Sequence, residues 1–538
     1  MGIEYLRRTP APISDLAEET MVRMRDGIRL ATDVYLPDGN REPGPTILVR
    51  LPYDKNGAYS FMPEIAEHMT RRGYRVVAQD VRGKFRSEGE TLMAVNEAYD
   101  GYDTIDWITK QPWSDGIVGM WGESYYGLTQ WAAASTAHPA LRAIVPRHTG
   151  TRLAEIPPTE PEWAFGRQYL LTHFHGNDDI EWEFDWTRRP YADTVEEFFA
   201  TVGSRSASYD LTFPHQVALR RFPAGHPFDA PAVPTLMLMG WWDNCAHWQW
   251  QDYAELLRRP AWSRLLYLQI EATDHENYSH FDLPITPEND PAVNQRARQR
   301  MFGRYIDPSL DFFDVFLRGH AGTIPRIRWQ LANSGDRAFH ESPSWPPPGT
   351  RTLVLHASGS SLIHEPGPSE VVTWVHDPED PVPSPMPDSF AFLRYHPDEQ
   401  DTMNRKDVLA FTTDPVTTDL DLTGPVTVQA RVSSDGPELD LFARLLDVSP
   451  DGAAHLITRG RTTAIGLQDI TVSLGHIGYR LRSGHSLRLM IASTDAPEFI
   501  PAPGNGEHRW LAQSTKPNTQ QVHLGPDGGL TVRLTVAG

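Results

Sequence analysis

The stretch from Ile117 to Ala134 constrains the chain most, because it places a strand, a tight turn and a helix in direct succession. Its sequence, IVGMWGESYYGLTQWAAA, begins with apolar strand residues and ends with good helix formers, and Ser124 lies at the turn. Such a turn presents the serine hydroxyl at the edge of a sheet, beside the amide groups that open the following helix. Gly122 and Gly127 lack the Cβ atoms that would obstruct the turn and the helix. This geometry suits a nucleophile, although the spacing G-x-S-x-x-G also fits a chance serine between two glycines.

Strands and helices alternate around this stretch. Residues 21–36 alternate apolar and polar side chains on both sides of Asp26-Gly27, which predicts an antiparallel hairpin. Compact apolar runs predict buried strands at residues 46–51, 74–79, 141–145, 234–240 and 265–270. Helical spacing occurs at residues 62–72, 98–109 and 248–257, and at 293–317 with an interruption near Asp307-Pro308. This order predicts a mostly parallel sheet that is covered by helices on both faces, with catalytic loops at the carboxyl ends of its strands.

Two regions depart from this alternation. From about residue 150 to residue 230, helical fragments rich in Trp, Phe and Glu predict a cap inserted between two strands. Beyond about residue 319 come short β-rich runs such as IRWQLA, RTLVLH, VTVQARVS and HSLRLMIAST, with Pro, Gly and Asp in the turns between them. Such spacing is typical of an all-β sandwich or jelly roll.

Composition excludes several classes of protein. A length of 538 residues suggests about three or four domains, and a hydrophobic content of 40% fits a globular enzyme. The formal charge of -21 is spread along the chain, so no nucleic-acid partner is expected. The single cysteine, Cys245, cannot form an intramolecular disulfide, and neither a secretory signal nor an apolar run of membrane-spanning length is visible. We therefore expect a cytoplasmic protein with no membrane partner.

Ser124 needs partners, because a serine hydroxyl is a poor nucleophile at neutral pH. A histidine must act as its base, and a carboxylate must fix the tautomer of that histidine. In α/β-hydrolases these residues follow in the order Ser, Asp or Glu, His, on loops after successive strands. Asp243 follows the strand PTLMLMG, and His275 follows the strand LLYLQI. The sequence therefore predicts Ser124, Asp243 and His275 as a catalytic triad, with His280 as an alternative base.

Several longer motifs carry a family resemblance. They are RDGIRLATDVYLP, LPYDKNG, QDVRGKFRSEG, YDTIDWITKQPWSDGIVGMWGESYYG, GWWD, and TDLDLTGPVTVQARVSSD with the later APEFIPAPGNG. Through these motifs the chain resembles the cocaine esterase-type hydrolases, which are related to the Xaa-Pro dipeptidyl-peptidases and the α-amino acid ester hydrolases. The resemblance implies an α/β-hydrolase fold with an inserted helical cap and a C-terminal all-β jelly roll. We expect the hydrolase domain at residues 1–149 and 231–318, the cap at 150–230 and the jelly roll at 319–538.

Carried over to this chain, the resemblance makes Ser124 the nucleophile, Asp243 the acid and His275 the general base. It also implies an oxyanion hole formed by the hydroxyl of Tyr53 and the backbone amide of Tyr125. No HGGG stretch offers a second backbone donor, and a phenol is a competent donor at neutral pH. A packing role is the alternative for Tyr53. The resemblance implies neither a metal nor an organic cofactor.

Two local features leave roles open. Glu271-Ala272-Thr273 stands where the family often has Gly-Pro-Trp shortly before the histidine. In the cap, the segment His173-Phe174-His175-Gly176-Asn177-Asp178-Asp179 suits either a metal or amine site or a solvated loop. Four aromatic residues of the cap fit either an acyl pocket or the cap's own core, namely Trp163, Phe165, Trp182 and Trp186.

The sequence thus predicts a serine hydrolase that cleaves an ester or amide bond of a small molecule through an acyl-enzyme intermediate. Three alternatives stay open: an Xaa-Pro dipeptidyl-peptidase, an acyltransferase or lactone-processing enzyme of a biosynthetic pathway, and a non-catalytic binding protein. The motifs determine neither the acyl group nor the leaving group, and a homo-oligomer also stays open.

Overall fold

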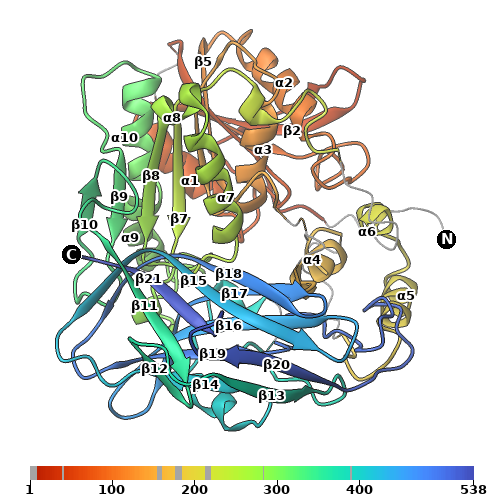
Figure 1. The fold of residues 1–538 in the computed structure, drawn as a ribbon. Coiled ribbons are helices and arrows are strands. Elements are labelled where there is room, and N and C mark those ends of the chain that lie inside the picture. Colours follow the sequence, from red (N-terminus) through yellow and green to blue (C-terminus); the bar gives the residue numbers. More distant parts are fainter. Residues whose placement is uncertain are drawn as a thin grey trace.

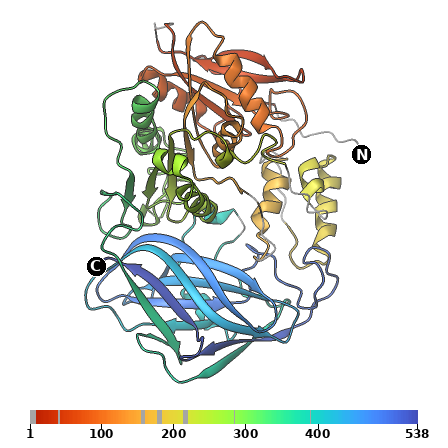
Figure 2. The same ribbon diagram turned by 45° about the horizontal axis from the view of Figure 1, so that its top comes forward.

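Two β-sheets and a helical insert make up the protein (Figure 1). The structure, a computed structural model, describes residues 9–38, 42–153, 155, 160–175, 184–212, 220–282, 284–387 and 390–538. The first sheet and its helices come from the N-terminal part of the chain, and the teal and blue strands of the C-terminal part form the second sheet. Figure 2 shows the yellow helices of the insert standing beside the blue strands.

The first sheet is parallel in its middle and antiparallel towards its edges. Its order is β1-β2-β4-β3-β5-β6-β7-β8-β9-β10. The strands are β1 (Glu18–Arg23), β2 (Arg29–Tyr35), β3 (Gly44–Leu51), β4 (Arg75–Asp80), β5 (Ser114–Glu123), β6 (Leu141–Arg147), β7 (Thr235–Gly240), β8 (Leu266–Glu271), β9 (Ile327–Gln330) and β10 (Phe339–Ser342). The predicted hairpin at Asp26-Gly27 is confirmed, since β1 and β2 pair antiparallel. Gly27 takes a φ of 95° there, which a glycine adopts without steric cost.

Helices cover both faces of this sheet. One face carries α1 (Met62–Arg71), α9 (Gln295–Tyr305) and α10 (Asp307–Phe316), and the other carries α2 (Glu97–Ile108), α3 (Ser124–Ala134), α7 (Ala246–Leu257) and α8 (Pro260–Leu265). Leu48 of β3 packs towards the second group, whereas its neighbours Ile47 and Val49 pack towards the first. Burial on both faces explains why these strands read as unbroken apolar runs. None of the helices in the described part of the chain is long and apolar enough to cross a membrane.

The insert between β6 and β7 is helical, as the sequence predicted. It contains α4 (Ala164–Gln168), the π-helix η1 (Tyr169–His173), α5 (Tyr191–Val202), α6 (Ala207–Thr212) and the 3-10 turn η2 (Pro227–Asp229). Its aromatic side chains share one core with Tyr125 and Leu128 of α3 and with Phe499 and Trp510 of the C-terminal part. The insert therefore packs against both of the other parts of the chain.

The second sheet is built from the C-terminal strands. They are β11 (Arg351–Ser358), β12 (Ser361–Ile363), β13 (Glu370–His376), β14 (Leu409–Thr412), β15 (Leu420–Ser434), β16 (Leu439–Val448), β17 (Ala454–Ala464), β18 (Gln468–Leu481), β19 (Ser486–Ala492), β20 (Asn518–Leu524) and β21 (Thr531–Val536), with the 3-10 turns η4 (Ala391–Leu393) and η5 (Gln400–Asn404). The run IRWQLA, which the sequence analysis placed in this β-rich part, instead forms β9 and pairs parallel with β8. Its composition fits either sheet, and only the long-range pairing decides between them.

Backbone and indole hydrogen bonds join the two sheets. Trp242 Nε1 donates to the carbonyl of Leu456 on β17 at 3.2 Å, whereas the neighbouring Trp241 Nε1 donates within the first sheet, to the carbonyl of Gln330 on β9 at 2.8 Å. The amide of Ala332 donates to the carbonyl of Gly478 on β18 at 2.8 Å. One apolar cluster runs without interruption from the first sheet into the second. The turn after β7, which carries Asp243, is thereby tied to the C-terminal strands.

Gly478 offers a test of this junction. A Cβ atom there would lie 2.7 Å from Trp241 Cζ2 and 3.0 Å from the carbonyl oxygen of Gln330. Because neither neighbour has room to retreat, Gly478→Ala should lower the free energy of unfolding by roughly 1–3 kcal/mol, measured by urea denaturation. The matched variant Gly322→Ala, whose Cβ would meet Val315 at 3.4 Å, should change it by less than about 0.5 kcal/mol. Equal effects of the two substitutions would contradict a tight junction.

Candidate active site

The turn between β5 and α3 holds Ser124 in a strained conformation. Ser124 has a φ of 52°, in the left-handed region that non-glycine residues rarely adopt. A Cβ atom on Gly122 would collide with the ring of Tyr126, and one on Gly127 would lie 2.5 Å from Thr149 Cγ2. Both glycines are therefore required, because neighbouring residues lie too close to the turn to leave room for a β-carbon. The strained serine at the carboxyl end of a central strand is the geometry of a nucleophile turn.

Asp243 and His275 form the hydrogen bond that a catalytic triad requires. Asp243 follows β7 and His275 follows β8, and His275 Nδ1 lies 2.7 Å from Asp243 Oδ1. The Asp243 side chain is fully buried, and that of His275 is 11% exposed. Burial lowers the pKa of His275, but the hydrogen bond with Asp243 and the charge of that carboxylate outweigh burial and hold this pKa above its ordinary value. The pair therefore stabilises an imidazolium ion.

His148 links the serine turn to the histidine loop. It follows β6, and its carbonyl accepts a hydrogen bond from the amide of Ser124 at 3.2 Å. Its ring atom Nδ1 lies 3.3 Å from the carbonyl oxygen of His275. Sequence reasoning missed this residue. Its position directly after a buried strand, the same signal that identified Asp243 and His275, could have found it.

The loop that carries Tyr53 rests on a buried lysine. Lys55 is completely buried, and its Nζ lies 3.0 Å from Asp33 Oδ1 and 3.7 Å from Asp80 Oδ2. Its amide also donates to Asp80 Oδ1 at 3.0 Å. The Tyr53 hydroxyl lies 3.2 Å from the Tyr169 hydroxyl of the insert. Because Lys55 is fixed at several points, the backbone two residues earlier is fixed as well.

The side chain of Tyr125 is anchored in a second buried charge cluster. Its hydroxyl donates to Glu97 Oε1 at 2.9 Å and accepts from the amide of Ala94 at 2.8 Å. Glu97 Oε2 forms an ion pair with Arg50 Nη1 at 2.7 Å, and both side chains are buried. Tyr125 directly follows Ser124, so this anchor holds the backbone amide that the sequence analysis assigned to the oxyanion hole.

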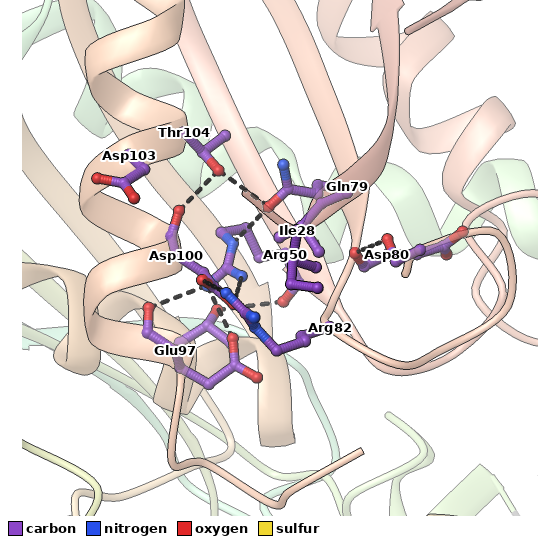
Figure 3. A network of polar contacts seen from close by, with 12 residues as sticks. Ile28, Arg50, Gln79, Asp80, Arg82, Glu97, Asp100, Asp103 and Thr104 are labelled. Atoms are coloured by element: carbon purple, nitrogen blue, oxygen red, sulfur yellow. Dashed lines mark hydrogen bonds and ion pairs between the residues drawn. The ribbon is translucent and has the colours of Figure 1, made fainter. Parts of the chain in front are cut away.

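Figure 3 shows how far this cluster extends: Glu97, Asp100 and Gln79 surround Arg50. Arg50 Nε donates to Gln79 Oε1 at 2.7 Å. Arg82 forms an ion pair with Asp100 at 2.6 Å and closes the cluster on the side of the loop after β4. Burial raises the pKa of Glu97, so its charged form depends on Arg50.

His280, the alternative base, and the single cysteine Cys245 have different surroundings from His275. His280, on the 3-10 turn η3 (His280–Asp282), stacks on Trp242 with ring centroids 5.2 Å apart, and burial lowers its pKa to about 3. Asp243 is bonded to His275 instead. Burial raises the pKa of the Cys245 thiol to about 12, so it stays protonated at neutral pH.

The C-terminal part of the chain holds the loop that carries His275. His396 Nε2 lies 3.0 Å from Asp274 Oδ2, and the amide of Glu276 donates to the carbonyl of Leu393 at 3.1 Å. His396 and Leu393 both lie between β13 and β14. The residues on either side of His275 in the sequence are thus tied to the second part of the molecule.

The cap residues singled out from the sequence have separate surroundings. Trp163 stacks on Phe165 with ring centroids 4.6 Å apart, and Trp186 packs against Trp510 of the C-terminal part at 6.5 Å. His175 Nε2 lies 2.9 Å from Ser204 Oγ. Trp182, the side chain of His173 and residues 176–179 lie outside the part of the chain that the structure describes.

A cavity of about 460 Å³ lies beside Asp243, between the turn after β7 and strands β17 and β18. Trp163 of the insert and Phe392 of the C-terminal part contribute aromatic walls, and Arg459 and Arg461 contribute charge. The insert, the first sheet and the C-terminal strands therefore meet at this cavity.

The anchor of Tyr125 can be tested by a double-mutant cycle. Tyr125→Phe leaves the amide of Ala94 and Glu97 Oε1 without a partner and should cost about 1–3 kcal/mol of unfolding free energy. Because Glu97→Gln disturbs the same cluster, the two changes should be non-additive by about 0.5–3 kcal/mol in urea denaturation. Tyr74→Phe, which breaks a hydrogen bond to Asp314, should add independently to Glu97→Gln. Strict additivity in the first pair would contradict the anchor.

Comparisons with known proteins identify the relatives of this chain. The family model described as X-Pro dipeptidyl-peptidase (S15 family) matches residues 26–166, and the one described as X-Pro dipeptidyl-peptidase C-terminal non-catalytic domain matches residues 320–528. The chain is 28% identical to a cocaine esterase of Rhodococcus sp. (strain MB1 Bresler), over 95% of this chain and 97% of that protein.

Solved structures show the same fold. An aminopeptidase from a marine sediment archaeon (Thaumarchaeota archaeon) matches with a TM-score of 0.78 at 21% identity, and an α-amino acid ester hydrolase matches with a TM-score of 0.77 at 23% identity. Each match covers 98% of both chains. At these identities the likeness concerns the fold, an α/β-hydrolase with a C-terminal β domain. The sequence matches support a serine hydrolase that is related to the cocaine esterases and to the X-Pro dipeptidyl-peptidases.

Proposed function

We propose that the protein hydrolyses an ester of a small molecule through an acyl-enzyme intermediate on Ser124. The observation that carries this proposal is the buried 2.7 Å hydrogen bond between His275 and Asp243. His148 connects this pair with the strained turn of Ser124, because its backbone carbonyl accepts from the Ser124 amide and its ring nitrogen Nδ1 lies 3.3 Å from the carbonyl oxygen of His275. A histidine–carboxylate pair beside a nucleophile turn is the arrangement that acyl transfer needs.

In the proposed reaction Ser124 Oγ attacks the carbonyl carbon while His275 Nε2 takes its proton. Asp243 holds the proton on Nδ1 and stabilises the imidazolium ion that forms. The imidazolium then protonates the leaving alkoxide, and the C–O bond breaks to leave an acyl-serine. Water enters, gives its proton to His275, and releases the carboxylic acid as Ser124 regains its proton.

Two donors are proposed to stabilise the oxyanion of each tetrahedral intermediate. One is the Tyr53 hydroxyl, and the other is the backbone amide of Tyr125. The buried clusters around Lys55 and Glu97 support this assignment, because they hold the backbone at both donors. Donors that are fixed before the reaction stabilise developing charge without reorganising.

Aromatic side chains of the insert pack behind the Tyr125 donor. Phe174 of the insert stacks on Tyr125 with ring centroids 5.5 Å apart, and Tyr169 stacks on Phe174 at 5.9 Å. All three rings are buried, so they support the side chain of Tyr125 from the side of the insert. An Xaa-Pro dipeptidyl-peptidase is the second candidate, because the matched family models carry that description.

Ser124→Ala tests the nucleophile directly. Hydrolysis of p-nitrophenyl butyrate should fall by roughly 10⁴–10⁶-fold, because no acyl-enzyme forms, and a fluorophosphonate probe should label the wild type alone. Gly-Pro-p-nitroanilide, assayed in parallel, separates an esterase from a peptidase. Full turnover by a folded Ser124→Ala variant would refute the assignment, and a wild-type protein that the probe fails to label would point to a binding role.

Tyr53→Phe tests the oxyanion donor. Removing one donor should lower kcat by about 10²–10³-fold and leave KM nearly unchanged, because the hydrogen bond strengthens only in the transition state. Tyr59→Phe is the matched control, since Tyr59 packs edge-on against Tyr53 with centroids 5.4 Å apart and is mostly exposed. If both variants lose the same small fraction of kcat, Tyr53 is a packing residue.

A further inference from the structure

Three potential metal ligands gather at the carboxyl ends of β6, β7 and β8. They are His148, Asp243 and His275, and one nitrogen or oxygen atom from each lies within 4.8 Å of the other two. Among the described residues, no other group of three or more His, Cys, Asp or Glu side chains meets this spacing. His148 is the residue that distinguishes this cluster from the histidine–carboxylate pair of an ordinary triad.

Two buried acceptor atoms in this cluster lack a hydrogen-bond partner. They are Asp243 Oδ2 and His148 Nε2, as judged over the described part of the chain. Because His148 Nδ1 faces the carbonyl oxygen of His275 at 3.3 Å, the ring proton belongs on Nδ1, which leaves a lone pair on Nε2. A buried lone pair without a donor is unfavourable, and a bound cation would satisfy both atoms at once.

The donor set suits a transition-metal ion. Two imidazole nitrogens and one carboxylate oxygen are ligands that Zn²⁺ prefers, in a tetrahedral arrangement whose fourth position is taken by water. With bonds of about 2.0–2.1 Å, tetrahedral ligands lie about 3.3 Å apart, so the three side chains would move together by about 1.5 Å at most. The adjacent Arg147 does not oppose a cation with its full charge, because it is paired with Glu271 at 3.2 Å.

We propose that His148, Asp243 and His275 form a Zn²⁺ site and that Zn²⁺ bound there switches the enzyme off. On binding, the proton of His275 Nδ1 leaves to solvent. Metal bonds from Nδ1 and from the Asp243 carboxylate replace the hydrogen bond between them, and His148 Nε2 supplies the third ligand. With Nδ1 held by the metal, the His275 ring can no longer form the imidazolium ion that acyl transfer requires. The binding half of this proposal is independent of the enzymatic reaction, whereas the inhibitory half rests on the proposed function.

Cobalt spectroscopy of the full-length protein tests the binding half. Co²⁺ should give one visible absorption spectrum of a nitrogen- and oxygen-ligated site per chain, and Zn²⁺ should displace it. His148→Asn retains an N–H donor for the carbonyl of His275 but removes the ring nitrogen that binds metal. It should therefore weaken the affinity at least about tenfold.

His138→Asn is the matched control, because His138 is also buried and its Nδ1 accepts a hydrogen bond from the amide of Ala140 at 3.1 Å. It should bind Co²⁺ as the wild type does. Equal affinity of His148→Asn and wild type for Co²⁺ would overturn the proposal. If His148→Asn proves unfolded by circular dichroism, His148→Gln takes its place in the same comparison.

Inhibition of p-nitrophenyl butyrate hydrolysis tests the second half. Zn²⁺ should abolish turnover by the wild type, EDTA should restore it, and the residual activity of His148→Asn should need at least tenfold more Zn²⁺ for the same loss. If the protein hydrolyses no ester when it is free of metal, but gives the cobalt spectrum once Co²⁺ is added, the proposed function is refuted and the metal site stands. An active enzyme that binds Zn²⁺ through His148 without losing turnover would refute the inhibitory half.

Discussion

The left-handed backbone of Ser124 is the constraint on which the active-site geometry depends. A residue with a β-carbon in this conformation costs on the order of 1–3 kcal/mol, so the surrounding structure must hold it. Gly122 and Gly127 leave the necessary space, and the hydrogen bond from the amide of Ser124 to His148 fixes the turn against β6. Because α3 begins at this residue, the position of the Tyr125 amide follows from the same turn.

Buried charges give the site its rigidity. Lys55 anchors the loop of Tyr53, and Arg50, on the preceding strand β3, pairs with the Glu97 carboxylate that holds Tyr125. A buried ion pair contributes little net stability, because desolvation offsets much of the attraction. Few arrangements of the side chains are nevertheless compatible with it, since each charge must keep its partners within hydrogen-bonding distance. Such clusters therefore favour one arrangement of the two loops over its alternatives.

Much of the first sheet could be predicted from the sequence, because strands buried on two faces and amphipathic helices leave local periodic patterns. The helix predicted at residues 62–72 is α1, and the interruption near Asp307 separates α9 from α10. Longer-range features could not be predicted in this way. Nothing local assigns IRWQLA to the first sheet, and the contact of Glu97 with Tyr125 depends on packing between distant segments. His148 lay in no motif, although its place after β6 carried the signal.

The hydrogen bonds from His396 and Leu393 to the loop of His275 bear on whether the N-terminal and C-terminal parts of related proteins can be combined in one chain. Asp274 and Glu276, on either side of His275, are held by residues that belong to the C-terminal part. A chimaera that combined this N-terminal part with the C-terminal part of a relative would keep Ser124, Asp243 and His275 but not the partners of Asp274 and Glu276. Such a chimaera would hold the loop of His275 only if its C-terminal part placed a histidine and a loop carbonyl where His396 and Leu393 lie here.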